Sequence, residues 1–321
     1  MPPDLDGLAT ALGELLPAGS VAREQRVADL TTYRVGGAIS VVVRVVDETG
    51  LLAVADAIDR TPVPVLVLGR GSNLLVADRG FPGLGIVLAG TFEDLEIDAA
   101  AGTARAGGAV PLPVLARRAA AAGLGGLEFL VGIPGSVGGA VRMNAGGHGR
   151  ETREVLVCAS VFDLGGGAAS RGLVRDRAGL DLSYRHSNVG PTEVVTRAEF
   201  RGRVDPPAVC VARVDEIVRW RRQHQPGGAN AGSVFRNPPG DSAGRLIDAA
   251  GLKGFAVGGA VVSEKHANFF QAGPDACAGD VYALIREVRE RVAAATGISL
   301  EPELQMVGFD SDFERDAGSR P

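Results

Sequence analysis

The sequence contains few cysteine, histidine and aromatic residues, and it lacks long apolar runs. Its 321 residues include 3 cysteines without CxxC spacing, so neither a disulfide framework nor a zinc ribbon is indicated, and a reducing, cytoplasmic compartment is favoured. The 4 histidines form no HxxH or HExxH pair, so we expect no metal site. No apolar run approaches the ~20 residues that cross a bilayer, and the acidic N-terminal stretch is not typical of a signal peptide.

Positive charge does not predominate either: 33 basic residues stand against 38 acidic ones, which gives a net charge of −5. Such a chain lacks the overall electrostatics of a general nucleic-acid binder. The hydrophobic fraction of 45% and the charged fraction of 22% are those of a globular protein. The length suggests two domains, with three small ones possible. Glycine is abundant, with 46 residues, and it is clustered.

Apolar periodicity predicts both helices and strands along the chain. Helices are predicted over 48–60, 111–122, 208–222 and 278–296, with a shorter one that begins at Asp241 or Ser242 and ends at Gly251. Strands are predicted over 63–68, 85–88, 155–163 and 193–201, the first of them fully buried. In the helix over 208–222 the apolar face is expected to comprise Val211, Val214, Ile217 and Val218. In the helix over 278–296 it is expected to comprise Val281, Leu284, Ile285, Val288 and Val292.

The first glycine cluster follows a predicted strand and reads Gly69-Arg70-Gly71-Ser72-Asn73. Its two glycines allow a sharp turn and a close approach to a ligand, and its successive N–H groups could cradle a phosphate. A purely structural turn is an equally good interpretation. It is neither a Walker loop, which needs GK[ST], nor a Rossmann fingerprint, because Leu74 stands where the sixth-position glycine is required.

The second cluster is denser and covers Gly132–Gly139, with the sequence GIPGSVGG. Pro134 stiffens it, while its glycines keep it free of side chains, which suits a rigid loop passing close to a flat or polyanionic ligand. The segment Asn144-Ala145-Gly146 follows and could add an amide donor. The alternative is a tight strand-to-helix connection.

Three further sites carry residues capable of chemistry. Arg185, in the run Tyr184-Arg185-His186-Ser187, could hold a carboxylate through two hydrogen bonds or form a surface salt bridge. Ser233 lies outside any GxSxG elbow, so it is either a hydroxyl directed into a cleft or a cap. Either Glu301 or Glu303 could act as an acid or stabilising group, and the alternative is a solvated loop.

Taken in order, these segments resemble the UDP-N-acetylenolpyruvoylglucosamine reductase family over about residues 25–308. The matching segments are Thr31–Gly37, Leu68–Val76, Gly132–Gly146, Ser183–Ser187, Asn230–Pro238, Ala243–Gly254, Ser263–Phe269 and Leu300–Glu303. The short link from Arg185 to Pro206 resembles the shorter branch of the family, which lacks an inserted tyrosine loop.

The resemblance implies an α+β fold: a two-subdomain FAD-binding fold of the vanillyl-alcohol-oxidase type, followed by a C-terminal α+β substrate-binding domain. The implied boundaries are 1–90 and 91–206 for the FAD-binding subdomains, 207–302 for the substrate-binding domain, and 303–321 for a C-terminal segment with the catalytic glutamate and a polar tail. The implied FAD-binding residues are Gly69, Arg70, Gly71, Ser72, Asn73, Ile133, Pro134, Gly135, Ser136, Gly139, Asn144, Ala145 and Gly146.

The resemblance also implies chemistry, in which NADPH reduces the flavin and the flavin reduces an enolpyruvyl UDP-sugar for peptidoglycan synthesis. Arg185 would hold the substrate carboxylate, Glu303 would assist, and Ser233 would donate a proton. Substrate contacts are implied for Tyr184, Arg236, Asn237 and His266. The family often has a lysine just before Pro226, where this chain instead offers Arg222 or His224.

Two other functions stay open at this point. Another flavin-dependent oxidoreductase, such as a sugar or alcohol oxidase, could use the same scaffold, and so could a nucleotide-sugar binding protein without activity. The expected partners are small molecules, namely the UDP-sugar and NADPH, and not nucleic acid or membrane. We expect a monomer or weak dimer.

Overall fold

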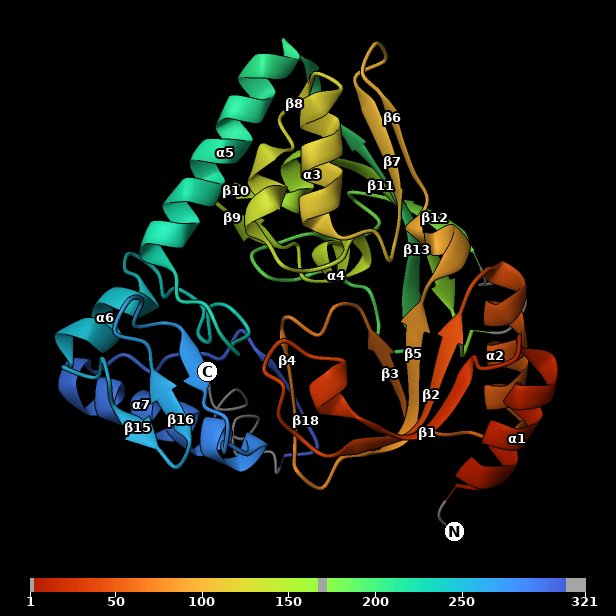
Figure 1. Cartoon of the computed structure of the whole chain (residues 1–321), viewed down its shortest axis with the longest axis horizontal. Coiled ribbons are helices and arrows are strands. Elements are labelled where there is room, and N and C mark those ends of the chain that lie inside the picture. Colours follow the sequence, from red (N-terminus) through yellow and green to blue (C-terminus); the bar gives the residue numbers. More distant parts are fainter. Residues whose placement is uncertain (1–2, 167–171, 310–321) are drawn as a thin grey trace. The chain divides into compact units, whose positions relative to one another are not determined.

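The structure of the chain is a computed structural model that describes residues 3–166 and 172–309 (Figure 1). The predicted polar tail at 310–321 lies outside the described residues. The chain forms two compact units. The first unit comprises Met1–Gln25, Ser40–Ser72 and Pro82–Pro226, and the second comprises Arg26–Ile39, Asn73–Phe81 and Gly227–Pro321.

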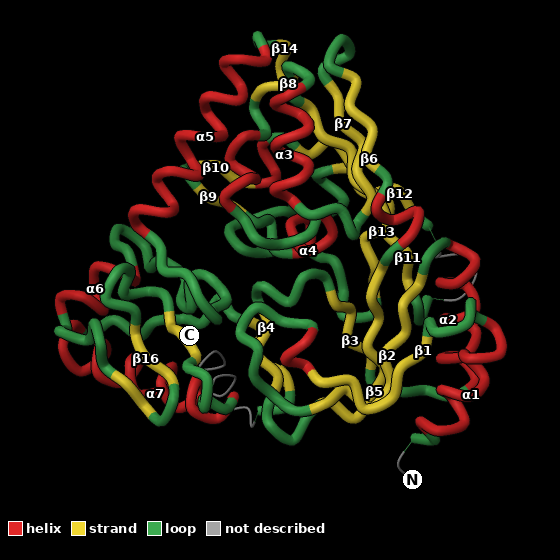
Figure 2. Tube along the Cα trace, viewed as in Figure 1, coloured by secondary structure: helices red, strands yellow, loops and turns green. Residues whose placement is uncertain are grey.

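The first unit contains a four-stranded sheet with the strand order β1-β2-β5-β3. The strands are β1 (Val21–Arg26), β2 (Ala38–Val45), β3 (Val65–Leu68) and β5 (Phe81–Leu88), and β3 and β5 are parallel. Figure 2 shows the helices α1 (Leu5–Leu15) and α2 (Glu48–Arg60) beside this sheet. Apolar side chains of both helices share a core with those of β2 and β5.

A second sheet of the first unit has five strands in the order β12-β11-β13-β7-β6, and each adjacent pair is antiparallel. The strands are β6 (Leu95–Asp98), β7 (Thr103–Gly107), β11 (Leu156–Asp163), β12 (Leu173–Asp176) and β13 (Glu193–Arg201). Three helices share its core: α3 (Leu112–Ala121), α4 (Val137–Arg142) and α5 (Pro207–His224). Two short antiparallel pairs complete this part of the chain: β8 (Leu124–Gly125) with β14 (Arg203–Val204), and β9 (Gly146–Gly147) with β10 (Arg150–Glu151).

Single turns of 3₁₀ helix connect several of these elements. They are η1 (Val27–Asp29), η2 (Gly90–Glu93), η3 (Glu128–Gly132) and η4 (Thr152–Glu154). The turn η4 is stabilised by a capping box. The Glu151 side chain accepts a hydrogen bond from the Glu154 N–H, and the Glu154 side chain accepts one from the Glu151 N–H.

In the second unit the helix α7 (Ala278–Thr296) packs its apolar stripe against a three-stranded antiparallel sheet. The strands are β15 (Ala256–Val257), β16 (Ala260–Val262) and β17 (Phe270–Ala272). The short helix α6 (Ala243–Ala249) begins at Ser242, whose hydroxyl accepts a hydrogen bond from the Arg245 N–H.

Two segments from the N-terminal part of the sequence belong to the second unit. The strand β4 (Leu74–Val76) pairs in parallel with β18 (Gln305–Val307), and the Asn73 carbonyl accepts a hydrogen bond from the Gln305 N–H at 3.1 Å. The segment 26–39 joins β4 through the Gly37 N–H, which donates to the Ala77 carbonyl at 3.1 Å. The linear domain boundaries implied by the resemblance stay a prediction. The structure adds that Arg26–Ile39 and Asn73–Phe81 belong to the same unit as the C-terminal part of the chain.

The predicted elements occur with small differences at their ends. The bounds of α2, α7 and β13 agree with the sequence prediction, and all five residues of the α7 stripe are buried. The predicted strand over 63–68 begins only at Val65 and is half-buried except for Leu68, because β3 lies at the edge of its sheet. The predicted apolar face of α5 was wrong at Val211, which is 40% exposed, whereas Cys210 is fully buried. No helix of the described residues combines the length and apolarity needed to span a bilayer.

A tyrosine hydroxyl without a partner lies in the core of the second unit. Tyr33 is fully buried among apolar side chains, and its hydroxyl has no hydrogen-bond partner in the described part of the chain. Burial also raises the pKa of Tyr33, so the group is neutral. A buried hydroxyl without a partner destabilises the fold by about 1–3 kcal/mol.

We therefore expect Tyr33→Phe to raise the thermal unfolding midpoint or leave it unchanged, because it removes only the unpaired oxygen. Tyr33→Ala should lower the free energy of unfolding by about 3–5 kcal/mol, since it leaves a cavity. Thermal melts of both variants, followed by circular dichroism, test the expectation. A midpoint for Tyr33→Phe that falls as far as that of Tyr33→Ala would contradict it.

Candidate functional site

The structure brings the two glycine-rich segments of the first unit together. Gly71 has a φ of 59°, a conformation that glycine adopts without strain. A Cβ atom placed on Gly69 would lie 2.6 Å from the Ser136 Oγ, and one on Gly135 would lie 3.5 Å from the Ser72 Oγ. The turn after β3 therefore lies against the loop before α4, and a side chain at Gly69 would clash with the Ser136 hydroxyl.

The second glycine segment is held rigidly by backbone hydrogen bonds. The N–H groups of Val137 and Gly138 donate to the carbonyls of Val110 and Gly108, at 2.9 and 2.8 Å. The Ser136 hydroxyl caps α4 by accepting from the Gly139 N–H at 3.4 Å. Because these groups already have partners, the segment keeps its shape without a ligand.

Asn144 was predicted to add an amide donor to this loop, but the structure gives its side chain protein partners. The residue is fully buried and has a φ of 39°. Its Nδ2 donates to the Glu151 carboxylate at 3.1 Å and to the Ser183 carbonyl at 2.8 Å, and its Oδ1 accepts from the Arg153 N–H at 2.9 Å. Any contact of Asn144 with a ligand would thus come from its backbone.

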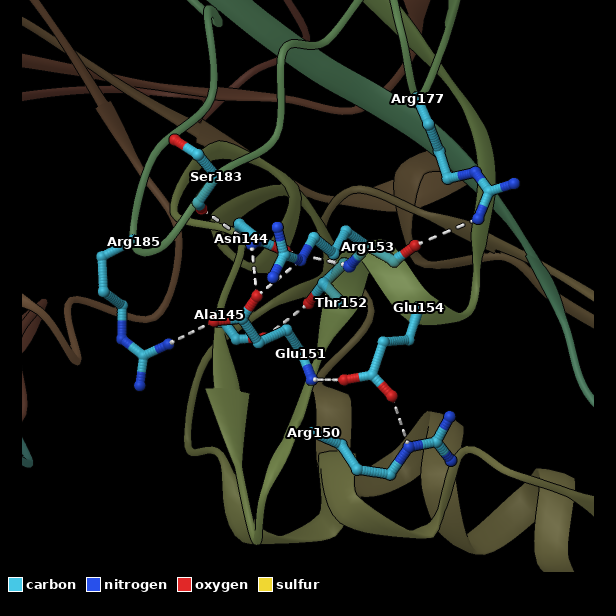
Figure 3. A network of polar contacts seen from close by, with 10 residues as sticks. All are labelled: Asn144, Ala145, Arg150, Glu151, Thr152, Arg153, Glu154, Arg177, Ser183 and Arg185. Carbon is cyan, nitrogen blue, oxygen red and sulfur yellow. Dashed lines mark hydrogen bonds and ion pairs between the residues drawn. The ribbon is translucent and has the colours of Figure 1, made fainter. Parts of the chain in front are cut away.

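Arg185 lies on a tight turn that Asn144 fixes in place (Figure 3). Ser183 and His186 form an antiparallel bridge around it, and Arg185 has a φ of 56°, which is uncommon for a non-glycine residue. Its guanidinium stacks over the Tyr184 ring with 4.9 Å between Cζ and the ring centroid. The Arg185 side chain is only 16% exposed, and its Nη1 lies 3.9 Å from the Glu151 carboxylate.

Aromatic and cationic side chains gather beside the second glycine segment, at the C-terminal end of α5. Trp220 stacks on the His224 ring at 4.6 Å and meets the His148 ring edge-on at 5.0 Å. The His224 Nδ1 lies 2.8 Å from the Trp220 carbonyl, which can only accept, so that nitrogen carries the proton. Burial and the nearby Arg221 lower the pKa of His148. A Cβ on Gly132 would meet both His148 and Arg221.

In the second unit, Ser233 lies at one end of an extended segment held on both sides. Ser233 bridges to Phe269, and Phe235 bridges to Pro302. The Glu303 N–H donates to the Val234 carbonyl at 2.7 Å, and the Glu303 carbonyl accepts from the Asn73 side chain at 3.2 Å. The two predicted catalytic residues of this unit are therefore brought onto neighbouring segments.

Asn268 fixes this arrangement, and sequence reasoning missed it. The side chain of Asn268 is buried, and it both accepts from the Phe235 N–H at 3.0 Å and donates to the Phe235 carbonyl at 2.8 Å. The His266 Nδ1 accepts from the Asn268 N–H at 3.3 Å, and burial lowers the pKa of His266. The neutral ring thus carries its proton on Nε2.

The remaining predicted substrate residues of this unit have distinct surroundings. The Asn237 Oδ1 accepts a hydrogen bond from the Ala243 N–H at 3.1 Å, at the start of α6. The Arg236 Nε is buried without a hydrogen-bond partner in the described part of the chain. An unpaired buried donor is costly, and packing alone does not account for it.

The described residues contain one cluster with the geometry of a cation site, formed by Glu128, Asp205 and Cys210. The Arg213 Nη1 contacts both carboxylates, at 3.3 Å from Glu128 and 2.5 Å from Asp205. Hydrogen bonding to Arg213 is the largest cause that lowers the pKa of Asp205. The guanidinium thus supplies the positive charge that these carboxylates need.

The predicted site residues therefore fall into two groups. The first unit holds Gly69, Arg70, Gly71, Ser72, Ile133, Pro134, Gly135, Ser136, Gly139, Asn144, Ala145, Gly146, Tyr184 and Arg185. The second holds Asn73, Ser233, Arg236, Asn237, His266 and Glu303. Sequence reasoning also missed Glu151, and the only signal for it was its position seven residues after Asn144, at the end of the same glycine-rich stretch.

Two family models match the chain. One, described as the C-terminal domain of UDP-N-acetylenolpyruvoylglucosamine reductase, matches residues 223–307, and the other, described as an FAD binding domain, matches residues 39–169. These matches confirm the predicted α+β fold class, an FAD-binding fold followed by a C-terminal domain. They also agree with the prediction that FAD is the cofactor.

Curated proteins and solved structures give the same picture. UDP-N-acetylenolpyruvoylglucosamine reductase from Rhodopseudomonas palustris (strain HaA2) is 44% identical over 312 residues, which cover 95% of this chain and 97% of the relative. The protein of that name from Syntrophotalea carbinolica is 43% identical, over 94% of this chain and 98% of its own. The crystal structure of UDP-N-acetylenolpyruvylglucosamine reductase from Thermus caldophilus matches with a TM-score of 0.74 and 38% identity, over 89% of this chain and 98% of that one.

The close approach of the two glycine segments generates a prediction about FAD binding. Gly69→Ala should weaken FAD binding about tenfold, because its Cβ would clash with the Ser136 hydroxyl, and such overpacking costs about 1–3 kcal/mol. Gly13→Ala is the control, since it lies in α1, outside the proposed FAD-binding residues, and its Cβ would meet no atom within 4 Å. FAD titration of the apoproteins, followed by flavin fluorescence, measures both. Equal affinities for the two variants would show that the approach at Gly69 does not shape the FAD site.

Proposed function

The chain belongs to the UDP-N-acetylenolpyruvoylglucosamine reductase family, and we propose that it reduces UDP-N-acetylglucosamine enolpyruvate to UDP-N-acetylmuramate for peptidoglycan synthesis. The observation that carries the proposal is 44% identity to a reductase of this name over 95% of the chain. Contacts within each of the two units support the roles proposed below for individual residues.

The two glycine segments suit an FAD molecule. FAD combines a flat ring with a polyanionic pyrophosphate, and both need a backbone that can approach without side-chain bulk. The close approach of Gly69 to Ser136, which leaves no room for a side chain, supports this fit, as does the rigid backbone of Ser136–Gly139. Residues 69–73, 133–136 and 139 would hold the cofactor, together with the backbone of 144–146. Bound FAD would supply the hydride-transfer chemistry, with NADPH as the reductant.

Arg185 would hold the carboxylate of the enolpyruvyl group. When hydride adds to the terminal methylene carbon, negative charge develops on the neighbouring carbon and spreads into that carboxylate. A guanidinium held in a fixed orientation stabilises such charge more strongly than mobile water does. The stacking on Tyr184 and the low exposure of the Arg185 side chain support this role.

Ser233 would then complete the reduction by donating its hydroxyl proton to the carbon that carries the negative charge. A serine is a weak acid, but an enolate-like carbon is a strong base, so the transfer is favourable. Glu303 would assist the stabilisation of the carboxylate, and its hydrogen bond to Val234, next to Ser233, supports a shared site for both residues. Arg236, Asn237 and His266 of the same unit would contact the substrate, with Arg236 as a cationic partner for its phosphates.

The partners are the UDP-sugar and NADPH, and the protein acts in the cytoplasm as a monomer or weak dimer without nucleic acid or membrane. The chain is assigned to the shorter branch of the family, and its domains are divided near residues 90, 206 and 302. Near Pro226, His224 or Arg222 takes the place of the lysine often found in the family.

A direct assay tests the proposed activity. Protein loaded with FAD is mixed with NADPH and UDP-N-acetylglucosamine enolpyruvate, and the absorbance of NADPH at ~340 nm is followed. We expect NADPH oxidation that depends on the substrate and stops when the substrate is exhausted. Oxidation at the same rate without the substrate would contradict the proposal.

Ser233→Ala separates proton donation from the preceding steps. We expect FAD binding and flavin reduction by NADPH to be unchanged, while product formation falls by about 10²–10⁴, because the substrate carbon loses its proton donor. Ser242→Ala is the matched control, since it removes a hydroxyl of the same unit that only caps α6. Stopped-flow measurement of flavin reduction and reoxidation distinguishes the steps. Full turnover by Ser233→Ala would remove Ser233 from the mechanism.

A further inference from the structure

The Arg185 guanidinium lies near a carboxylate from the hairpin of β9 and β10. Glu151 is the last residue of β10, and it pairs in register with Gly146 of β9. Its carboxylate lies 3.9 Å from the Arg185 Nη1, while the Arg185 Nη2 lies 3.5 Å from the Gly146 carbonyl. Two neighbouring strands thus present an acceptor to each terminal nitrogen of one guanidinium.

The Glu151 carboxylate is itself held firmly. The Asn144 side chain donates to its Oε2 at 3.1 Å, and the Arg153 Nε lies 2.8 Å from the same oxygen. The carboxylate also accepts a backbone hydrogen bond within η4. With only 17% of its side chain exposed, Glu151 is therefore a fixed negative charge and not a mobile surface group.

Asn144 ties this charge to the turn that carries Arg185. The same Nδ2 that donates to Glu151 also donates to the Ser183 carbonyl, two residues before Arg185. A single buried amide thus sets the distance between the carboxylate and the backbone from which Arg185 extends. The Thr152 hydroxyl, which donates to the Ala145 carbonyl at 2.8 Å, closes the same hairpin.

The length of the Glu151–Arg185 contact indicates what it does. Charge-assisted hydrogen bonds between a guanidinium and a carboxylate are ~2.7–2.9 Å long. At 3.9 Å the Arg185 guanidinium and the Glu151 carboxylate therefore attract each other without forming a bidentate hydrogen-bonded pair. Such a contact orients the guanidinium without locking it to the carboxylate. A tight pair would instead compete with a substrate carboxylate for the same N–H groups.

We infer that Glu151 is a positioning residue that holds the Arg185 guanidinium in the orientation required by the substrate carboxylate, with Asn144 as its anchor. The inference rests on the proposed function, in which Arg185 binds that carboxylate. Misplacing a charge-stabilising group by about 1 Å can cost ~10²-fold in rate, so the effect of Glu151 is measurable even though it does not touch the substrate.

The test compares Glu151→Gln with Glu154→Gln in the holoenzyme. Glutamine keeps the shape and a hydrogen-bonding oxygen at either position but removes the charge. Glu154 is the matched control, because it lies in the same turn and bonds to Arg150 at 3.0 Å and to the Glu151 N–H at 2.7 Å. For Glu151→Gln we expect kcat/KM for the enolpyruvyl substrate to fall about 10- to 100-fold, with flavin reduction by NADPH within about twofold of wild type. Glu154→Gln should stay within about twofold in both.

A double-mutant cycle with Arg185→Lys separates positioning from a general structural role. If Glu151 acts through Arg185, Glu151→Gln should change the reoxidation rate far less in the Arg185→Lys background than in wild type. Glu151→Asp, which keeps the charge, should recover part of the lost activity. Additive effects of the two substitutions, or an equal loss in both half-reactions, would overturn the inference.

The arms of this experiment also separate the inference from the proposed function. Wild-type protein that fails to oxidise NADPH with the substrate would overturn the function and, with it, the role of Glu151. A large loss of reoxidation in Arg185→Lys together with wild-type behaviour of Glu151→Gln would overturn only the inference.

Discussion

The buried amide of Asn144 is the interaction on which the candidate site of the first unit depends. Its three hydrogen bonds join Asn144, which follows the second glycine segment, to Glu151 of β10, to Arg153 of η4 and to the turn that carries Arg185. A buried amide is costly unless its groups are paired, so alternative arrangements of these loops, which would break one or more bonds, are disfavoured. The geometry around Arg185 is thus set by polar pairing, although the surrounding core is apolar.

The second unit also contains a buried asparagine side chain that fixes the backbone near a candidate catalytic residue. Asn268 bonds to both the N–H and the carbonyl of Phe235, and so it fixes the extended segment in which Ser233 lies two residues earlier. In both units a buried asparagine lies outside the proposed catalytic set and orders the backbone that carries a member of it. Fully paired polar groups specify one geometry more sharply than apolar contacts, which tolerate small shifts. A proton donor and a charge-stabilising group both need a well-fixed position, because their effects on the reaction rate fall steeply with distance.

The sequence predicted regular elements well and long-range pairing poorly. The bounds of α2 and α7 follow from apolar periodicity and caps, which are local signals. The parallel pairing of β4 with β18 joins residues more than 200 positions apart, and no local pattern encodes it. The candidate site shows the same division: local patterns suggested its glycine segments and Arg185, which stay predictions, whereas Glu151 and Asn268 were missed. A lone glutamate or asparagine looks like any surface residue until the fold supplies its partners.

Backbone strain gives a further reason to regard the first unit's site as preorganised. Six non-glycine residues of the described chain have a positive φ, and Asn144, His148 and Arg185 are among them. Such conformations cost on the order of 1–3 kcal/mol each and persist only where the surroundings enforce them. Here the bridge between Ser183 and His186 and the Asn144 amide supply that enforcement for Arg185. Because folding has already set this conformation, ligand binding need not supply the energy to reach it, and more of the binding energy remains for stabilising charge on the substrate.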